Sequence, residues 1–245
     1  MNLLPELVKS NFHIHTHFSA CAAADMIVPN ILSQAKKRGL KKVALVDHDH
    51  DNKNDLLNKI NLVKNEVEKF HPQLELIVGA ELSAFGINKF GDTLAINRKI
   101  DFRLYSTNHY HLAFWEHPAE RTARAYAEHT LCILENLINA KRADCIAHPF
   151  VGIYLHDILA DHTQVTQALS DNELADILEL GKKNQVAWEL NTKAIFFDPI
   201  FAKRLWAIGR EVGVKFLVGT DAHHLSEIED PPVIEQKLKM ILTRA

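Results

Sequence analysis

The sequence predicts an α/β fold with a parallel sheet, because seven short strand-like segments alternate with helix-like segments along the chain. Each strand-like segment is rich in apolar or β-branched residues and is bounded by turn or helix signals. Several are continuous Val, Ile, Leu and Ala runs, which is typical of parallel strands covered by helices. The seven segments are residues 11–16, 42–48, 74–82, 102–111, 144–149, 185–191 and 215–223.

The helix-like segments carry apolar residues at helical spacing. They are residues 29–39, 53–70, 119–141, 171–183, 198–213 and 231–244. Two of them, 29–39 and 198–213, have proline near the start and glycine at the end, which is the usual asymmetry of a helix. Residues 83–101 fit neither pattern, and we expect a small hairpin or a loop over the site there. No linker rich in Pro, Gly or Ser divides the chain, so a single domain over residues 1–245 is expected.

The composition is that of an ordinary globular protein, with 47% hydrophobic and 24% charged residues in a chain of 245. No apolar run approaches the roughly 18 residues of a membrane span, and the N-terminus lacks the pattern of a signal peptide. Three cysteines do not make a disulfide framework, so we expect a reducing, cytoplasmic setting and no membrane partner. A net charge of −3 argues against long nucleic acid as a partner, because binding to its backbone depends on Lys and Arg.

Histidine is the unusual component, and its placement predicts a metal site. Ten of the 15 histidines lie at or just beyond the carboxyl ends of predicted strands, where parallel barrels and sheets carry their sites. In "HIHTH" the alternation of His13 and His15 directs both side chains to one face of a strand. The polar residues at the strand ends are His13, His15, Asp47, His48, Glu81, His109, His111, His148, Glu189, Asn191, Asp221 and His223.

Imidazole and carboxylate ligands together suit Zn, Mn or Fe. Seven or eight of them exceed the four ligands of one tetrahedral site, so the set fits two or three divalent metals that share bridging carboxylates, with Glu81 and Asp221 as the candidates. Closely spaced metals activate water near neutral pH and clamp the oxygens of a displacement, which is most useful for phosphate esters. No GxSxG, Walker or GxGxxG motif offers a rival chemistry.

The ordered motifs "HIHTHFSAC", "VDHDH", "GAE", "AHP" and "GTDAH", with a histidine-bearing fourth strand, resemble the PHP (polymerase and histidinol phosphatase) superfamily of metal-dependent phosphoesterases. The resemblance extends from residue 11 to about residue 225. It implies a distorted (β/α)7 barrel with the metal site at the C-terminal ends of the strands. It further implies hydrolysis of phosphate esters by a hydroxide bound to a cluster of two or three metals. We expect the substrate to be a small phosphorylated metabolite or nucleotide.

The resemblance also implies three groups of ligands around the shared carboxylates Glu81 and Asp221. The groups are His13, His15, Glu81 and Asp221 for a first metal, Glu81, His109 and His148 for a second, and His48, His223 and Cys21 for a third. His109 is preferred to His111 because members of the family commonly have Ser or Thr two residues before this ligand, as Thr107 is here.

Two residues depart from the family pattern. Asn11 stands where the family often has Asp, and Cys21 stands where many members have His or Asp. Cys21 is therefore either a thiolate ligand, which would favour Zn, or the sign of a weak or absent third metal. Lys193, Arg121 and Arg124 are candidates for contacts to phosphate, and solvated surface charge is an equally good interpretation of each.

Three other functions are compatible with the sequence. The first is a nucleic-acid phosphodiesterase of exonuclease type, against which the near-neutral charge argues. The second is a different metal-dependent amidohydrolase, but no strand offers a metal-bridging lysine. The third is a non-catalytic metal-binding protein with a degenerate site, against which the nearly complete ligand set argues.

Overall fold

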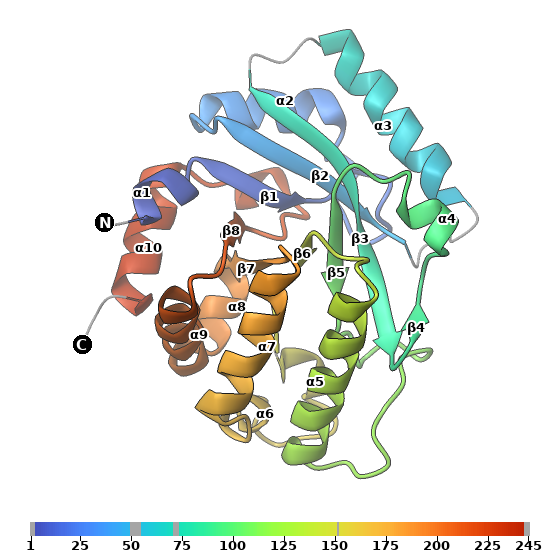
Figure 1. The fold of residues 1–245 in the computed structure, drawn as a ribbon. Coiled ribbons are helices and arrows are strands. Elements are labelled where there is room, and N and C mark those ends of the chain that lie inside the picture. Colours follow the sequence, from blue (N-terminus) through green and yellow to red (C-terminus); the bar gives the residue numbers. More distant parts are fainter. Residues whose placement is uncertain (1–2, 50–54, 71–73, 151, 243–245) are drawn as a thin grey trace.

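The computed structural model describes residues 3–49, 55–70, 74–150 and 152–242 (Figure 1). Seven parallel strands pair in the order β1-β2-β3-β5-β6-β7-β8, and the short β4 pairs antiparallel with β3. The strands are β1 (Ser10–Ile14), β2 (Lys42–His48), β3 (Glu75–Gly86), β4 (Lys89–Phe90), β5 (Arg103–Ser106), β6 (Cys145–Ile146), β7 (Ala187–Asn191) and β8 (Phe216–Gly219). The predicted parallel α/β fold is confirmed.

The last strand returns to the first and nearly closes the sheet into a barrel. Ile14 and Ala222 form a parallel bridge, and the backbone N–H of His15 donates to the carbonyl of Ala222 at 2.9 Å. Below this bridge the Asn11 side chain joins the two strands: its Nδ2 donates to Thr220 Oγ1 at 2.7 Å, and its Oδ1 accepts from Thr220 N at 3.1 Å. Asn11 Oδ1 also accepts from the backbone N–H of His13 at 3.2 Å. Asn11 therefore takes part in closing the barrel.

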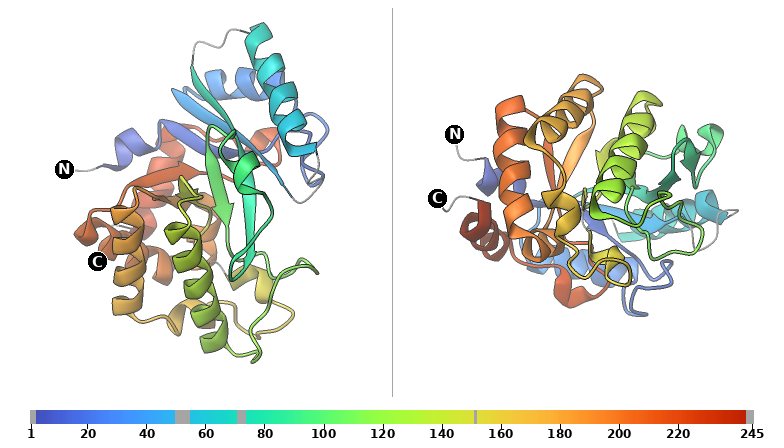
Figure 2. Two further views of the ribbon diagram at one scale, coloured as in Figure 1. Left: turned by 45° about the vertical axis from the view of Figure 1, so that its right-hand side comes forward. Right: turned by 90° about the horizontal axis from the view of Figure 1, so that it is seen from below.

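Helices surround the sheet on its outer side, with α2 and α3 over β1–β3 and α5, α7 and α9 along the opposite part of the ring (Figures 1 and 2). The helices are α1 (Leu4–Leu7), α2 (Val28–Lys37), α3 (Leu56–Phe70), α4 (Leu94–Asn97), α5 (Ala123–Asn139), α6 (Gln164–Gln167), α7 (Asp171–Lys183), α8 (Thr192–Phe197), α9 (Pro199–Val212) and α10 (Pro231–Leu242), with 3-10 turns η2 (Gly152–Leu155) and η3 (Leu225–Glu227). None of the helices described is both long enough and apolar enough to cross a bilayer.

The helix ends follow local chemistry. Thr122 caps α5 by accepting from the Ala125 N–H, and Ser170 forms a capping box with Glu173 at the start of α7. Helix α9 begins at Pro199 and is followed by Gly213 with φ 80°, the left-handed conformation that glycine adopts without strain. This agrees with the proline and glycine signals of residues 198–213.

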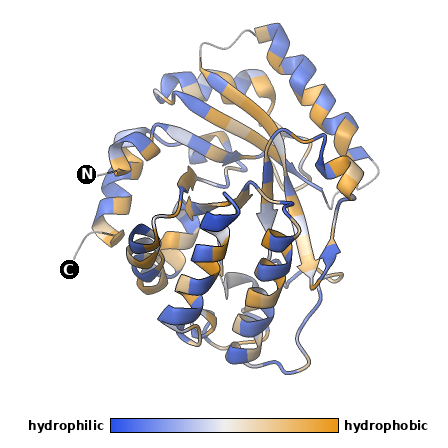
Figure 3. Cartoon of the chain, in the orientation of Figure 1, coloured by the Kyte–Doolittle hydropathy of each residue, from blue (hydrophilic) through white to orange (hydrophobic). Residues whose placement is uncertain are grey.

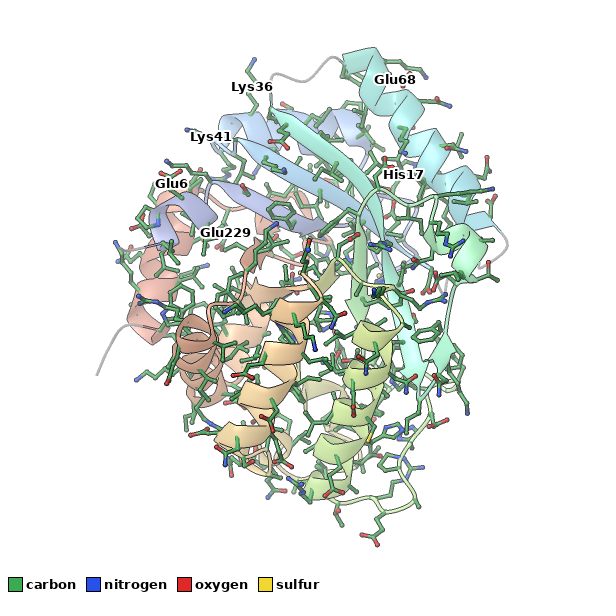
Figure 4. All side chains as sticks on the ribbon, viewed as in Figure 1. Glu6, His17, Lys36, Lys41, Glu68 and Glu229 are labelled. Carbon is green, nitrogen blue, oxygen red and sulfur yellow. The ribbon has the colours of Figure 1, made fainter. Side chains whose placement is uncertain are left out.

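Side chains of β2 alternate between two cores. Val43 and Leu45 join the large core under the helices, whereas Ala44 and Val46 belong to a smaller cluster inside the barrel. The helices turn apolar sides toward the sheet and hydrophilic sides outward (Figure 3), and Lys36 on α2 points to solvent (Figure 4). His48 continues the inward series of β2, so the same alternation that fills the barrel also directs this residue to its interior.

Several segments differ from the predicted bounds. The expected strand 102–111 ends at Ser106, because Asn108 leaves the ladder and its Nδ2 donates to the carbonyl of His148 at 3.1 Å. His109 therefore lies in a loop and not on a regular strand. The unassigned segment 83–101 contains the end of β3, strand β4 and helix α4. Parts of two predicted helices, residues 53–54 and 243–244, lie outside the described residues.

Replacement of Asn11 by alanine should destabilise the protein by about 2–3 kcal/mol, because three buried hydrogen bonds at the β1–β8 junction are lost and two backbone N–H groups lose an acceptor. Urea unfolding of the metal-free protein measures this. Asn30→Ala is the control, since Asn30 makes one exposed side-chain bond to the Asp25 carbonyl and should change stability by less than about 0.5 kcal/mol. Equal stability of the two variants would contradict the role given to Asn11.

Candidate metal centre

The nine predicted ligands meet at the carboxyl end of the barrel, around a cavity of about 450 Å³. His13 and His15 are fully buried and adjoin Glu81 and Asp221. The remaining seven line the cavity: Cys21, His48, Glu81, His109, His148, Asp221 and His223. Four further residues complete the lining: Ala20, His111, Leu112 and Tyr154. The structure thus brings the whole predicted set together, from loops and strand ends far apart in the sequence.

The first group consists of two imidazoles and two carboxylates. His13 Nε2 and His15 Nε2 face each other at 3.1 Å. Asp221 Oδ1 lies 3.3 Å from His13 Nε2 and 3.1 Å from His15 Nε2, and Glu81 Oε2 lies 3.4 and 3.5 Å from the same two atoms. Ligand atoms of a tetrahedral site with metal bonds of 2.0–2.1 Å lie about 3.3–3.4 Å apart. The spacing of these four atoms therefore fits a divalent cation.

The second group uses the other oxygen of Glu81. Glu81 Oε1 lies 3.2 Å from His148 Nε2 and 3.8 Å from His109 Nε2. The three residues have potential ligand atoms within 4.8 Å of one another. His111 is exposed and does not join the group, which favours His109 as the ligand, as predicted.

The third group lies at the more open side of the cavity. His15, His48 and His223 have potential ligand atoms within 4.8 Å of one another, and the exposed Cys21 is hydrogen bonded to His48 and His223. Burial raises the pKa of the Cys21 thiol, but its bonds and charge interactions with these two imidazoles outweigh burial and bring the pKa to about 7. The position of Cys21 is thus compatible with a thiolate ligand.

A carboxylate that received no role from the sequence orients the first group. Glu189 Oε1 lies 2.8 Å from His13 Nδ1, and its Oε2 accepts from the backbone N–H of His148 at 2.6 Å. Gly219 on β8 makes room for this pair, because a Cβ there would lie 1.9 Å from Glu189 Oε1 and 2.7 Å from His13 Cβ. Glu189 therefore places a carboxylate against the ring of His13, whereas Asn11, which stands where the family often has Asp, has no carboxylate. Its position at the inward-facing end of β7 was the available sequence signal.

The rings of His15 and His148 are oriented in the same manner, through contacts at Nδ1. Ser19 Oγ lies 3.1 Å from His15 Nδ1 and donates to Asp47 Oδ1 at 2.7 Å. Asn108 Oδ1 lies 3.1 Å from His148 Nδ1. These contacts occupy the Nδ1 atoms, which leaves Nε2 of each ring directed at the cluster.

Two of the predicted ligands stand on strained backbone. His148 has φ 26° and Asp221 has φ 50°, values that L-residues seldom adopt. Hydrogen bonds hold these positions: the N–H of His148 donates to Glu189, and the Asp221 carbonyl accepts from Lys193 Nζ at 2.6 Å. Such strain is typical of residues that a surrounding structure holds in place for function.

The electrostatics of the cluster keep its carboxylates ionised. Burial would raise the pKa values of Glu81 and Asp221, but nearby imidazoles hold both well below their usual range. Burial lowers the pKa of His13, yet Glu189 and Asp221 outweigh it and hold that pKa well above normal. Burial and a neighbouring imidazole hold the pKa of His15 well below normal. Buried carboxylates are stable only when they are paired with positive groups, and the neighbouring imidazoles or bound cations can fill that role.

The three cations suggested as phosphate contacts do not line the cavity. Arg124 is exposed and bonds Glu173, while Arg121 donates to the Tyr126 hydroxyl at 2.7 Å. Lys193 contacts the backbone of Asp221, as described above, and Glu227 at 3.1 Å. Within the described part of the chain, no lysine or arginine side chain lines the cavity.

Comparison with known proteins agrees with this geometry. The sequence profile of the PHP domain matches residues 11–193. The chain belongs to the PHP domain family. The family predicted from the motifs is therefore confirmed, and the match includes all the predicted ligands except Asp221 and His223.

Relatives of this PHP protein cover most of its length. A probable phosphatase of Vibrio parahaemolyticus is 27% identical over 224 residues, which cover 87% of this chain and 78% of that protein. A probable histidinol-phosphatase of Thermotoga maritima is 25% identical over 226 residues, which cover 89% of this chain and 85% of that protein. The structure of histidinol phosphate phosphatase from Lactococcus lactis, complexed with Zn, L-histidinol and phosphate, is similar with a TM-score of 0.62 and 16% identity over 93% of this chain and 92% of that one. This likeness confirms the predicted barrel.

Replacement of Glu189 by glutamine should weaken metal binding by about 10–100-fold, because the ring of His13 loses its charged partner while the shape of the side chain is kept. Titration with Mn²⁺ or Zn²⁺ against a competing chelator measures the affinity. Glu211→Gln, at an exposed position of α9, is the matched control and should bind as the wild type does. Unchanged affinity in Glu189→Gln would contradict the orienting role.

Proposed function

We propose that this PHP protein hydrolyses small phosphate monoesters with the help of two or three divalent metal ions. The observation that carries the proposal is the convergence of three ligand groups at one buried cluster, in which Glu81 belongs to two groups and lies 2.9 Å from His48 of the third. The family and its phosphatase relatives confirm the broader class, a phosphoesterase.

The residues divide the work as follows. A first metal ion would be held by His13, His15, Glu81 and Asp221, a second by Glu81, His109 and His148, and a third by His48, His223 and Cys21. Bound divalent ions would supply an activated water and offset the charge of the phosphoryl oxygens. Glu189, Ser19 and Asn108 orient the imidazoles, and the buried position of the cluster keeps bulk water from its inner side.

The cavity supports a small substrate with a single phosphoryl group. Its volume of about 450 Å³ is in the range of sites for small molecules. A polyanionic ligand would require lysine or arginine contacts beyond the metals, and the described lining has none. A phosphomonoester with an uncharged leaving group therefore fits this site better than a nucleic-acid strand.

The first test is phosphate release from a panel of phosphomonoesters in the presence of Mn²⁺ or Zn²⁺. Release should be abolished by a chelator and restored by metal. Glu81→Gln should lower kcat/KM by more than about 100-fold. Loss of a residue that only orients a metal ligand already lowers metal affinity or activity by about 10–100-fold, and Glu81 is proposed as a ligand itself. Glu211→Gln serves again as the matched control.

A negative result separates the alternatives. If the metal-loaded protein releases no phosphate from any monoester, the proposal is wrong. Cleavage of bis(4-nitrophenyl) phosphate alone would then indicate a phosphodiesterase, and no cleavage of either class would indicate a non-catalytic metal-binding protein.

Metal counting tests the second group of ligands. His109→Ala should lose one metal per chain relative to the wild type, whereas His111→Ala should keep the wild-type number, because His109 approaches Glu81 and His111 is exposed. Elemental analysis of dialysed protein gives the count. Loss of metal from His111→Ala and not from His109→Ala would reverse the assignment.

A further inference from the structure

The lining of the cavity contains one phenol in addition to the predicted ligands, and its side chain is half-buried. Tyr154, in the turn η2, lines the cavity, and its ring stacks on His111 with centroids 4.5 Å apart and an interplanar angle of 29°. The ring of His109 meets it edge to face at 4.8 Å, and that of His148 lies 6.2 Å away. Three imidazoles from two loops thus fix the direction of the Tyr154 ring.

Tyr154 brings a phenol hydroxyl to the lining of the cavity. The charges of Asp221 and Glu81, which also line the cavity, act on this hydroxyl, so it lies within electrostatic reach of the predicted ligands. A phenol has an ordinary pKa of about 10 and therefore carries its proton near pH 7. The Tyr154 hydroxyl makes no hydrogen bond to any residue that the structure describes, although the side chain is half-buried. Such a donor is available to a ligand.

The other lining residues that are not predicted ligands offer few hydrogen-bond donors. Ala20 and Leu112 have no polar side-chain atom, and His111 is exposed to solvent. Because the described lining has no lysine or arginine, Tyr154 and the exposed His111 are its only side chains outside the ligand set that can donate a hydrogen bond. An oxygen that projects from the cluster toward this part of the lining would meet the Tyr154 hydroxyl.

We propose that Tyr154 donates a hydrogen bond to the leaving-group oxygen of the phosphomonoester, an inference that rests on the proposed function. In hydrolysis the bond between phosphorus and the ester oxygen breaks, and its electron pair stays on that oxygen. The attacking water supplies the new oxygen–phosphorus bond and the proton that ends on the alcohol. Tyr154 stabilises the negative charge on the departing oxygen and is itself unchanged at the end of the cycle.

The test compares two esters that differ in their need for this stabilisation. With Tyr154→Phe, kcat/KM for glycerol 2-phosphate should fall about 100-fold, because an alkoxide is a poor leaving group. For 4-nitrophenyl phosphate the loss should be about 3-fold or less, because the leaving phenolate is stable without a donor. The metal content and the inhibition constant of inorganic phosphate should stay within about 3-fold of the wild type, since the departing oxygen is absent from that ligand.

Tyr126→Phe is the matched control, because it removes a phenol hydroxyl that bonds His117 and Arg121 outside the cavity. It should affect both esters equally and little. An equal loss for both esters with Tyr154→Phe, or no loss, would overturn the role of Tyr154 and leave the proposed function standing. A wild-type protein that binds metal and hydrolyses neither ester would overturn both.

Discussion

The carboxylate of Glu81 is the centre on which the site depends. Five imidazoles approach its two oxygens at distances of 2.9 to 3.8 Å, from β1, β2, and the segments after β1, β5 and β6. A buried carboxylate is costly unless it is paired, and here the pairing groups are the imidazole rings that are proposed as metal ligands. The register of β2 and β3 makes this arrangement possible, since His48 and Glu81 stand directly opposite each other.

The barrel must close for the cluster to form. His13 comes from the first strand and Asp221 from just beyond the last, so their contact requires the β1–β8 junction. Asn11 and the bridge of Ile14 with Ala222 hold that junction, and Gly219 allows Glu189 to reach His13 across it. The missing side chain of Gly219 and the side-chain amide of Asn11 are therefore both needed for the proposed ligands to meet.

The loop after β5 holds the proposed ligand His109 in place although it is not part of a strand. Tyr110, between His109 and His111, turns away from the cavity, and its hydroxyl lies 3.1 Å from His129 Nδ1 and 2.9 Å from Thr130 Oγ1 on α5. This anchor fixes the segment from the helix side, while Asn108 fixes it from the loop that carries His148. The two neighbouring histidines consequently have different surroundings: His109 is buried at the cluster and His111 is exposed.

The parallel α/β class, the position of most strands and the residues that meet at their ends could all be predicted from the sequence. Apolar periodicity and strand-end polarity are local properties, so they can be read without coordinates. His13, His48, Glu81 and Asp221 were recognised in this way.

The partner of each of these residues could not be predicted, because it depends on how distant parts of the chain pack together. Glu189 and Tyr154 carry no local signal that separates an orienting or donating role from ordinary polarity, because the role arises from contacts with His13 and with the cavity, which lie far away in the chain. The end of β5 at Ser106 could not be predicted from the neighbouring residues either, because it depends on the hydrogen bond from Asn108 to the carbonyl of His148. Long-range contacts of this kind form when the barrel closes, and they set the geometry of the site.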